Sequence, residues 1–145
     1  MIGVVLVTHG ELGAALLDAS AWITGAALKG VVAVPIDGPH DPRAQAEQIA
    51  RAVHGFEGGA VILTDLFGGT PQNLALTLLS EGSVDVVSGV NLPMLLAIPG
   101  GRDKSADAHA LALHLQSRGR GGMVVAGETL KRHAEASKEL PAVSP

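Results

Sequence analysis

The chain has 145 residues, the size of one ordinary domain, and a formal net charge of −4 from 10 basic and 14 acidic residues. Hydrophobic residues make up 47% and charged residues 17%, which provides enough apolar material for a packed core and argues against disorder. With 2% aromatic residues, no basic run and no cysteine, the composition excludes base-stacking surfaces, electrostatic capture of nucleic acid or anionic membrane, disulfides and thiolate metal sites.

The sequence carries no visible targeting or membrane segment. Its longest apolar stretches are strand-length and interrupted by glycine, well short of the roughly 20 residues that a membrane helix needs. Ile2–Val7 has no positively charged segment before it, so no signal peptide is predicted. We therefore expect one globular cytoplasmic domain over residues 1–126, followed by a polar, partly mobile tail over residues 127–145.

Four short apolar runs, rich in Val and Ile, are the predicted strands: Ile2–Val7, Val31–Ile36, Ala60–Thr64 and Val84–Val87. Because these runs barely alternate with polar residues, they predict a sheet covered on both faces, as parallel sheets are. Helical patterns separate them, at Glu11–Thr24, at Asp41–His54 and from Thr70-Pro71 to a stop at Gly82. This alternation predicts an α/β, doubly wound, mostly parallel sheet flanked by helices.

The last third of the chain is less regular. Asn91-Leu92-Pro93 opens a short apolar segment to Ile98, which Pro99-Gly100-Gly101 is expected to break. A further helix is predicted over Lys104–Arg118, with its alanines and leucines on one side. Met123–Ala126 is predicted to be a fifth strand.

Polar side chains follow the first and third predicted strands. Thr8-His9-Gly10 comes after the first strand, and Asp65–Pro71 comes after the third. In open α/β sheets, ligands bind beyond the carboxyl ends of the strands, where the strand order reverses. If the order is 2-1-3-4, the first and third strands are neighbours at that point, so these two segments are the first place to look for chemistry.

His9 is the candidate reactive group. A neutral imidazole can act as a nucleophile, and a carboxylate on one ring nitrogen fixes the tautomer so that the other nitrogen presents its lone pair. Asp65 is placed to be that carboxylate. The alternative interpretation is an ordinary loop-end histidine and an aspartate that caps a helix or a turn, and the residues alone leave both open.

Gly68-Gly69-Thr70-Pro71 adds a separate argument. Glycines let backbone N–H groups approach an anion closely, and the N-terminus of the following helix adds its positive end. The Thr70 hydroxyl is expected either to cap that helix or to hydrogen-bond an oxyanion, and a plain tight turn is the alternative. Beside His9 and Asp65, the segment favours phosphoryl transfer, which needs a nucleophile and donors for the phosphoryl oxygens.

Other known signatures are missing from the sequence. It contains no GxxxxGK[ST], GxGxxG, HExxH or GxSxG motif, so nucleotide, dinucleotide, zinc-protease and serine-hydrolase functions lack support. The remaining histidines have no carboxylate or histidine at ligand spacing and are expected to be solvated surface groups: His40, His54, His109, His114 and His133. We predict no metal and no cofactor.

Three blocks of the sequence closely resemble, in the same order, the mannose-family EIIA domain of the bacterial sugar phosphotransferase system: IGVVLVTHGELGAALLDAS, VILTDLFGGTPQNLAL and VDVVSGVNLPMLL. The similarity covers residues 1–98 and weakens towards residue 126, and the combination of DLFGGTPQN with SGVNLPM is its specific part. The resemblance implies a doubly wound sheet of order 2-1-3-4. It also implies an antiparallel fifth strand that is exchanged between the subunits of a homodimer.

The resemblance also implies the site residues. His9 matches the phosphorylated histidine, Asp65 the carboxylate that hydrogen-bonds it, and Thr70 a hydroxyl residue, commonly Ser, near the phosphoryl group. The residues expected to bind the phosphoryl group are Gly10, Gly68, Gly69 and Thr70, and those expected to line the site are Phe67, Asn91 and Pro93.

By this resemblance, the protein accepts a phosphoryl group from phosphohistidine HPr and gives it to a IIB partner, which phosphorylates a sugar during uptake. No metal, nucleotide or nucleic acid is implied, and the membrane permease is reached only through the partners. One alternative is a stand-alone regulatory EIIA that signals its phosphorylation state by binding other proteins. Another is a flavodoxin-like module that binds a phosphorylated ligand without reacting. The transported sugar is not encoded in this chain.

Overall fold

The computed structural model describes residues 1–80 and 82–139. Its strands are β1 (Gly3–His9), β2 (Val31–Ile36), β3 (Ala60–Thr64) and β4 (Val84–Ser88). Its helices are α1 (Leu12–Thr24), α2 (Pro42–His54), α3 (Thr70–Leu76), α4 (Leu92–Lys104), α5 (Ala108–Gly121) and α6 (Ala126–Glu139). The four apolar runs are confirmed as strands, and β1 extends further than expected, through His9.

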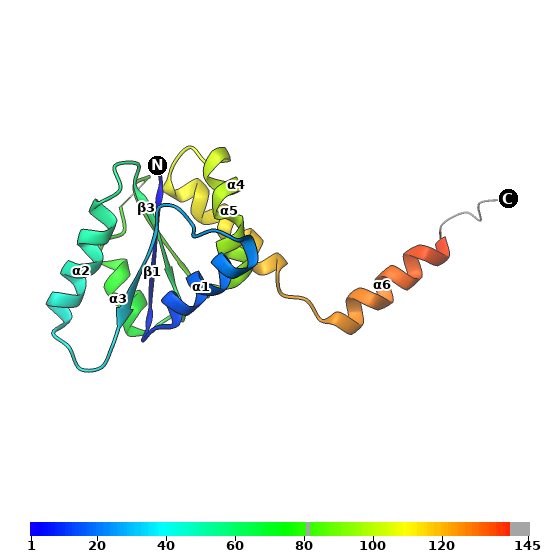
Figure 1. Ribbon diagram of the computed structural model, residues 1–145, viewed down its shortest axis with the longest axis horizontal. Helices are drawn as coiled ribbons and strands as arrows, with labels where there is room; N and C mark the ends of the chain where they lie inside the picture. Colours follow the sequence, from blue (N-terminus) through cyan, green and yellow to red (C-terminus); the bar gives the residue numbers. More distant parts are fainter. Residues whose placement is uncertain (81, 140–145) are drawn as a thin grey trace.

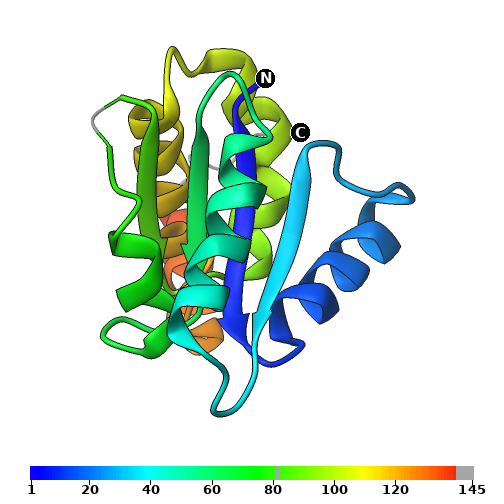
Figure 2. The same cartoon turned by 90° about the vertical axis from the view of Figure 1, so that its left-hand side faces the viewer.

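The strands form a parallel sheet in the order β2-β1-β3-β4; Figure 1 labels β1 and β3, and Figure 2 shows the four strands side by side. The pairing register places Val7 of β1 beside Thr64 of β3, and Thr64 beside Ser88 of β4. The predicted doubly wound α/β fold is therefore confirmed. Because β1 and β3 are neighbours and run in the same direction, the residues that follow them meet at one edge of the sheet.

Helices cover both faces of the sheet, with α2 and α3 on one face and α1, α4 and α5 on the other (Figure 2). All five residues of β3 are buried, because alternate side chains enter the two opposite cores. Val5 and Ile62 pack with Ile49 of α2, whereas Leu6 packs in the other core with Leu95 of α4. The near-continuous apolar character of the strands follows from this two-sided burial.

The helix starts follow the predicted signals only in part. Asp41 caps α2 as expected, because its side chain accepts a hydrogen bond from the Arg43 amide at 3.0 Å. Capping of α3 was one of the two roles expected for the Thr70 hydroxyl, but Thr70 is the first helical residue, and the extended residue Gly69 takes the cap position without a side-chain bond. The helix also ends at Leu76, well before the expected stop at Gly82.

The expected break at Pro99-Gly100-Gly101 is wrong, since α4 continues through these residues to Lys104. A proline inside a helix costs about 3 kcal/mol, so burial elsewhere must offset it. Gly101 is buried so close to α5 that an added Cβ would lie 2.6 Å from the His114 ring. Arg102 then ties the last turn of α4 to the sheet by donating to the carbonyls of Ile2 and Gly30, each at 2.7 Å.

The helix expected over Lys104–Arg118 is shifted, because Lys104 still belongs to α4. Asp107 caps α5, accepting a hydrogen bond from the Ala110 amide at 2.8 Å. The expected apolar side of this helix is confirmed, with four of its alanines and leucines buried: Ala108, Leu111, Ala112 and Leu115.

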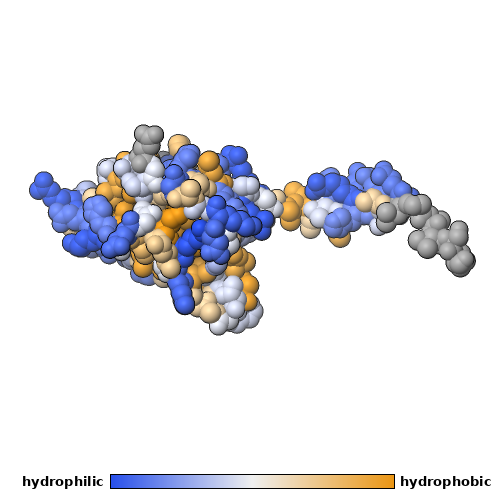
Figure 3. Space-filling view, turned by 90° about the horizontal axis from the view of Figure 1, so that it is seen from above, coloured by the Kyte–Doolittle hydropathy of each residue, from blue (hydrophilic) through white to orange (hydrophobic). Residues whose placement is uncertain are grey.

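The fifth strand expected over Met123–Ala126 is also wrong for the described chain. Residues 123–125 have no regular structure, and α6 begins at Ala126. Residues 122–139 form a C-terminal arm that extends away from the sheet and helices, with no buried residue in α6 (Figure 1). Its base is hydrophobic, whereas most of the helix is hydrophilic (Figure 3). A strand needs a hydrogen-bonding neighbour, and among residues 1–80 and 82–139 no strand pairs with this segment.

The structure does not test the expected division into a domain and a mobile tail, which stays a prediction. Residues 127–139 of the expected tail are helical, and residues 140–145 lie outside the described residues. In the part of the chain that the structure describes, no helix has the length and apolar character needed to cross a membrane.

Candidate phosphoryl-transfer site

The sheet brings His9 and Asp65 together at the carboxyl ends of two neighbouring strands. His9 is the last residue of β1, and Asp65 directly follows β3. The ring nitrogen Nδ1 of His9 lies 2.9 Å from Oδ2 of Asp65, and the backbone N–H of His9 donates to the same oxygen, also at 2.9 Å. The two residues are 56 positions apart, so the contact depends on the pairing of β1 with β3.

This geometry orients the imidazole. An ionised carboxylate accepts a hydrogen bond, so Nδ1 carries the proton and Nε2 is left with its lone pair. The side chain of His9 is 53% exposed, whereas that of Asp65 is 11% exposed. A partner molecule can therefore reach the ring while the carboxylate stays behind it.

The carboxyl group of Asp65 is tuned by opposing effects. Burial raises its pKa, but the hydrogen bonds from the backbone and ring of His9, together with the charge of His9, outweigh burial and hold the pKa below the ordinary value of 3.8. Oδ1 of Asp65 is buried and has no hydrogen-bond partner among the described residues. His9 thus stabilises the ionised form of Asp65, and both bonds converge on a single oxygen.

The glycine segment after Asp65 lies against the ring of His9. A Cβ added to Gly69 would lie 3.0 Å from Cε1 and 3.5 Å from Nε2 of His9, so a residue with a side chain would crowd the nitrogen that carries the lone pair. Gly68 has a φ of +85°, a conformation that favours glycine. Its N–H group donates to Oε1 of Gln72 in α3. Thr70, at the start of α3, is exposed.

The turn between β1 and α1 is shaped by Gly10 and by a residue that sequence reasoning missed. Gly10 has a φ of +53°, and its N–H donates to the carbonyl of Ile36 at 3.0 Å. The missed residue is Thr8, which is buried and accepts a hydrogen bond from the Gly13 amide at 2.9 Å. The sequence signal for a role of Thr8 was its position as a polar residue near the end of an otherwise apolar strand. Its hydroxyl holds the chain that presents His9.

The three residues expected to line the site lie in different surroundings. Phe67 is 81% exposed and lines a cavity of about 390 Å³ together with Gln72 and Ser88. Asn91 caps α4, accepting from the Met94 amide, and donates to the carbonyl of Gly119 in α5, both at 3.1 Å. Pro93 packs closely against Gly122 at the end of α5. The contacts of Asn91 and Pro93 thus join α4 to α5.

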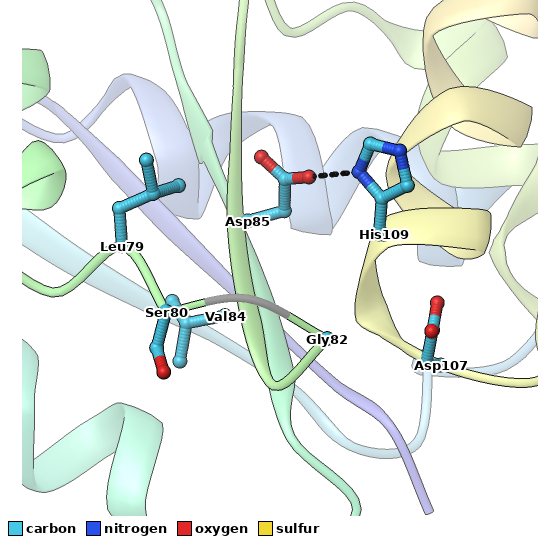
Figure 4. Close-up of a pocket in the computed structure, with 7 residues that line it drawn as sticks. All are labelled: Leu79, Ser80, Gly82, Val84, Asp85, Asp107 and His109. Carbon is cyan, nitrogen blue, oxygen red and sulfur yellow. Dashed lines mark hydrogen bonds and ion pairs between the residues drawn. The ribbon is translucent and has the colours of Figure 1, made fainter.

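A second histidine–carboxylate pair was not predicted. Nδ1 of His109, on α5, lies 2.6 Å from Oδ2 of Asp85, on β4 (Figure 4). His109 is exposed, as expected, but the expectation that it lacks a carboxylate partner is wrong. The hydrogen bond to Asp85 is the main cause that raises the pKa of His109, and the charges of Asp85 and Asp107 add to it.

The second pair has different surroundings from the first. It borders a cavity of about 590 Å³ that is also lined by Leu79, Ser80, Gly82, Val84 and Asp107, and on another side it borders the cavity of about 390 Å³ beside Phe67 and Gln72. Asp85 is the second residue of β4, so it lies several residues before the carboxyl end of its strand, whereas His9 is at the end of β1. Carboxylates surround His109, and like charge disfavours an incoming phosphoryl group. The pair at His9 is therefore the better candidate for phosphoryl chemistry.

No metal centre is formed by the described residues, among which no group of three or more histidines and carboxylates is placed to hold an ion. The chemistry available at the site is that of an exposed imidazole held by a carboxylate and flanked by glycines.

Comparison with known proteins gives a consistent result. Residues 3–115 match the family EIIA-man, described as PTS system fructose IIA component. The PTS system fructose-specific EIIA component of Bacillus subtilis (strain 168) is 34% identical over 101 residues, which make up 68% of each chain.

Solved structures show the same fold. The phosphotransferase system component EIIA from Streptococcus agalactiae matches with a TM-score of 0.79 and 26% identity, over 88% of this chain and 99% of that one. The mannose/sorbose specific IIA subunit from Enterococcus faecalis matches with a TM-score of 0.73 and 20% identity, over 99% and 98% of the two chains, and this likeness concerns the fold alone. His9, Asp65 and the glycine segment lie within the matched residues.

Proposed function

The chain belongs to the EIIA-man family of PTS fructose IIA components, and from this membership we propose that it accepts a phosphoryl group on His9 from phosphorylated HPr and passes it to a IIB partner. The family itself makes the chain a phosphocarrier component of a sugar phosphotransferase system. HPr as donor, IIB as acceptor and His9 as carrier are the proposed parts. This role belongs in the cytoplasm, with the membrane permease reached through IIB.

The contact between His9 Nδ1 and Asp65 Oδ2, at 2.9 Å, is the observation that carries the proposal. It leaves the Nε2 lone pair free to attack phosphorus in line with the bond that breaks. The new bond joins Nε2 to phosphorus, and the bond between phosphorus and the donor's imidazole nitrogen breaks, with its electron pair returning to the donor ring. The Nδ1 proton stays between His9 and Asp65 throughout.

The carboxylate stabilises the charge that develops on His9. The ring becomes positive when Nε2 bonds to phosphorus while Nδ1 keeps its proton, and Asp65 is a negative partner at hydrogen-bond distance. Transfer to IIB is the same step in reverse, with an acceptor side chain as nucleophile. Since the donor is another phosphohistidine, the reaction needs positioning and charge stabilisation and no further cofactor.

We propose that the residues around Nε2 of His9 bind the phosphoryl oxygens. Gly69 lies beside Nε2, Gly10 directly follows His9, and the hydroxyl of Thr70 is exposed at the start of α3. The approach of the phosphoryl group to a backbone without side chains explains the glycines at these positions. Phe67, which is exposed on the same loop, is placed to contact the protein that docks there.

Reconstituted transfer tests the proposal. The protein is incubated with labelled phosphoenolpyruvate, enzyme I and HPr, and the label is located by mass spectrometry. We expect acid-labile phosphate on His9 of the wild type and none on the His9→Ala variant. His109→Ala is the matched control, because His109 is also exposed and also bonded through Nδ1 to an aspartate, and it should be labelled like the wild type. Equal labelling of wild type and His9→Ala would refute the proposal.

We further propose that the protein is a homodimer that uses the C-terminal arm. Met123, Val124 and Val125 are 71%, 67% and 71% exposed, and β4 is the last strand at its edge of the described sheet. Contiguous exposed apolar residues and an open strand edge favour association with a second copy. Sedimentation equilibrium should give a dimer for the intact chain and a monomer when Val124 and Val125 are both changed to Asp. A wild-type monomer would contradict this.

A further inference from the structure

Gln72 is a polar residue whose side chain is buried in the first turn of α3. Its side chain is 5% exposed, on the first turn of α3, where its neighbour Pro71 is also buried. Burying an amide costs free energy unless its polar atoms are hydrogen-bonded. The bond that compensates for this burial is made by Oε1, which accepts from the backbone N–H of Gly68.

The bond closes the glycine segment onto the helix that follows it. In a capping box, the third helical residue reaches back to the amide of the cap residue. Gln72 is the third residue of α3 and Gly69 is the cap, but Gln72 reaches one residue further back, to Gly68. Gly69 provides no side-chain cap, so Gln72 supplies the side-chain tie between this loop and α3.

The position of this loop decides how much room there is at His9. The loop approaches so closely that a Cβ on Gly69 would be 3.0 Å from Cε1 of His9 and 3.5 Å from Nε2. Gly68 and Gly69 have no side chains of their own with which to hold such a position. A small shift of the loop would therefore either cover Nε2 or withdraw the backbone from it, and displacements of this size change the rates of positioned reactions strongly.

We propose that Gln72 is a positioning residue for phosphoryl transfer, which holds Gly68 and Gly69 in the place that leaves Nε2 of His9 open. This inference rests on the proposed function of His9. Gln72 acts through the loop and does not touch the phosphoryl group. Since the Gly68 N–H donates to Gln72, the inference gives Gly68 a role in holding the loop, in place of the expected role as a donor to the phosphoryl oxygens.

Three variants distinguish the effect of the hydrogen bond between Gln72 and Gly68 from the effects of side-chain shape and burial. Gln72→Met keeps the length of the side chain and removes the acceptor. Gln72→Glu keeps an acceptor at the first turn of a helix, where a negative charge is favourable. Gln45→Met is the matched control, because Gln45 is 7% exposed on α2, belongs to another loop–helix junction and undergoes the same substitution.

Two phosphoryl donors are used with each variant. Potassium phosphoramidate phosphorylates histidine without a partner protein: the bond between phosphorus and Nε2 forms, the bond between phosphorus and the amide nitrogen of the reagent breaks, and ammonia leaves. Mass spectrometry of peptides gives the ratio of label on His9 to label on His133, an exposed histidine of α6 that serves as a reference away from Gln72 within the same chain. The second donor is phosphorylated HPr, for which the maximal rate and the half-saturating concentration are measured. Exchange of the Gly68 amide and the thermal midpoint are recorded in parallel.

We expect Gln72→Met to lower the His9 to His133 ratio and the maximal rate from HPr by about tenfold, with the half-saturating concentration nearly unchanged. Exchange of the Gly68 amide should become faster in the same variant. Gln72→Glu should restore the slow exchange of the Gly68 amide, because the acceptor is kept, and Gln45→Met should match the wild type. A Gln72→Met protein with wild-type labelling would overturn the inference. A loss of His9 labelling that is fully explained by a lower thermal midpoint would also overturn it. If HPr fails to label the wild type, the proposed function fails, and the phosphoramidate ratio still decides the role of Gln72.

Discussion

Replacing Asp65 with Asn tests how much the charge behind His9 contributes. In the native site, the backbone N–H and the ring Nδ1 of His9 both bond to Oδ2 of Asp65, each at 2.9 Å. An asparagine with its carbonyl oxygen in that place accepts both bonds but carries no charge. The variant therefore keeps the geometry and removes the electrostatic part of the interaction.

The size of the effect follows from which of the two bonds changes during transfer. A hydrogen bond to a charged group contributes about 1.5–3 kcal/mol and a neutral one about 0.5–1.5 kcal/mol, so each bond loses about 1–1.5 kcal/mol. The backbone bond is the same before and during transfer and does not affect the rate. The ring bond strengthens as the imidazole becomes positive, and its loss of about 1.4 kcal/mol slows transfer about tenfold.

The same substitution should also lower folding stability. The backbone bond becomes weaker, and the NH2 group of asparagine takes the buried place of Oδ1, where no described residue is bonded to it. We expect the free energy of unfolding to fall by about 1–3 kcal/mol, which the thermal midpoint should register.

The assay is the initial rate of labelling from phosphorylated HPr, with thermal unfolding followed in parallel. Labelling of Asp65→Asn at the wild-type rate would show that the charge does not stabilise the transferring state. A loss of a thousandfold or more in a folded variant would equally refute the estimate, because Asp65 would then do more than orient the ring and balance its charge.

Three further predictions concern the two histidine sites. Asp85→Asn should lower the NMR titration midpoint of His109, because that carboxylate is the main cause that raises the pKa of His109. The pair stabilises the fold below the ordinary pKa of 6.5, and this stabilisation is lost as pH rises through the raised pKa. His9→Ala should raise the pKa of Asp65 measured by carboxyl NMR, because burial then acts without the ring. Gly69→Ala should slow labelling of His9 by about tenfold or more, since its Cβ would lie 3.0 Å from Cε1 of His9.

Each of these has a control or a contradicting result. An unchanged midpoint for His109 in Asp85→Asn would mean that the pair does not form in solution. An Asp65 pKa that stays low in His9→Ala would assign the lowering to the backbone N–H of residue 9, which the variant keeps, and not to the ring. For Gly69→Ala the control is Gly100→Ala on α4, where an added Cβ meets no atom within 4 Å, and equal labelling of the two variants would contradict crowding of the ring.

Local patterns account for most of the secondary structure. The bounds of Val31–Ile36 and Ala60–Thr64 agree with the prediction, because runs of Val and Ile form strands buried on both faces. Asp41-Pro42 starts α2 as expected, since the cap bond involves residues only two positions apart. The failures occur where distant contacts override local preference. Pro99 stays inside α4 because that helix is buried against the sheet and α5.

The candidate site shows the same division. His9 and Asp65 were predictable, because parallel strands end at one edge and both residues stand at strand ends. Gln72 was not singled out, because a glutamine on a helix is ordinary until its side chain is known to be buried. The pair of Asp85 and His109 was missed because it joins a strand to a helix, and the contact depends on how α5 packs beside β4.

What the amino-acid order determined by itself was the alternation of strands and helices, the covered parallel sheet and the two polar residues at the carboxyl ends of neighbouring strands. These follow from periodicity and from the chemistry of neighbouring residues, which act over a few positions. Only the tertiary structure decided that both His9 bonds meet on one oxygen of Asp65, that Gln72 holds the glycine loop, and that the arm leaves the domain as a helix. Such contacts are set by the packing of whole helices and strands, whose relative positions no local pattern contains.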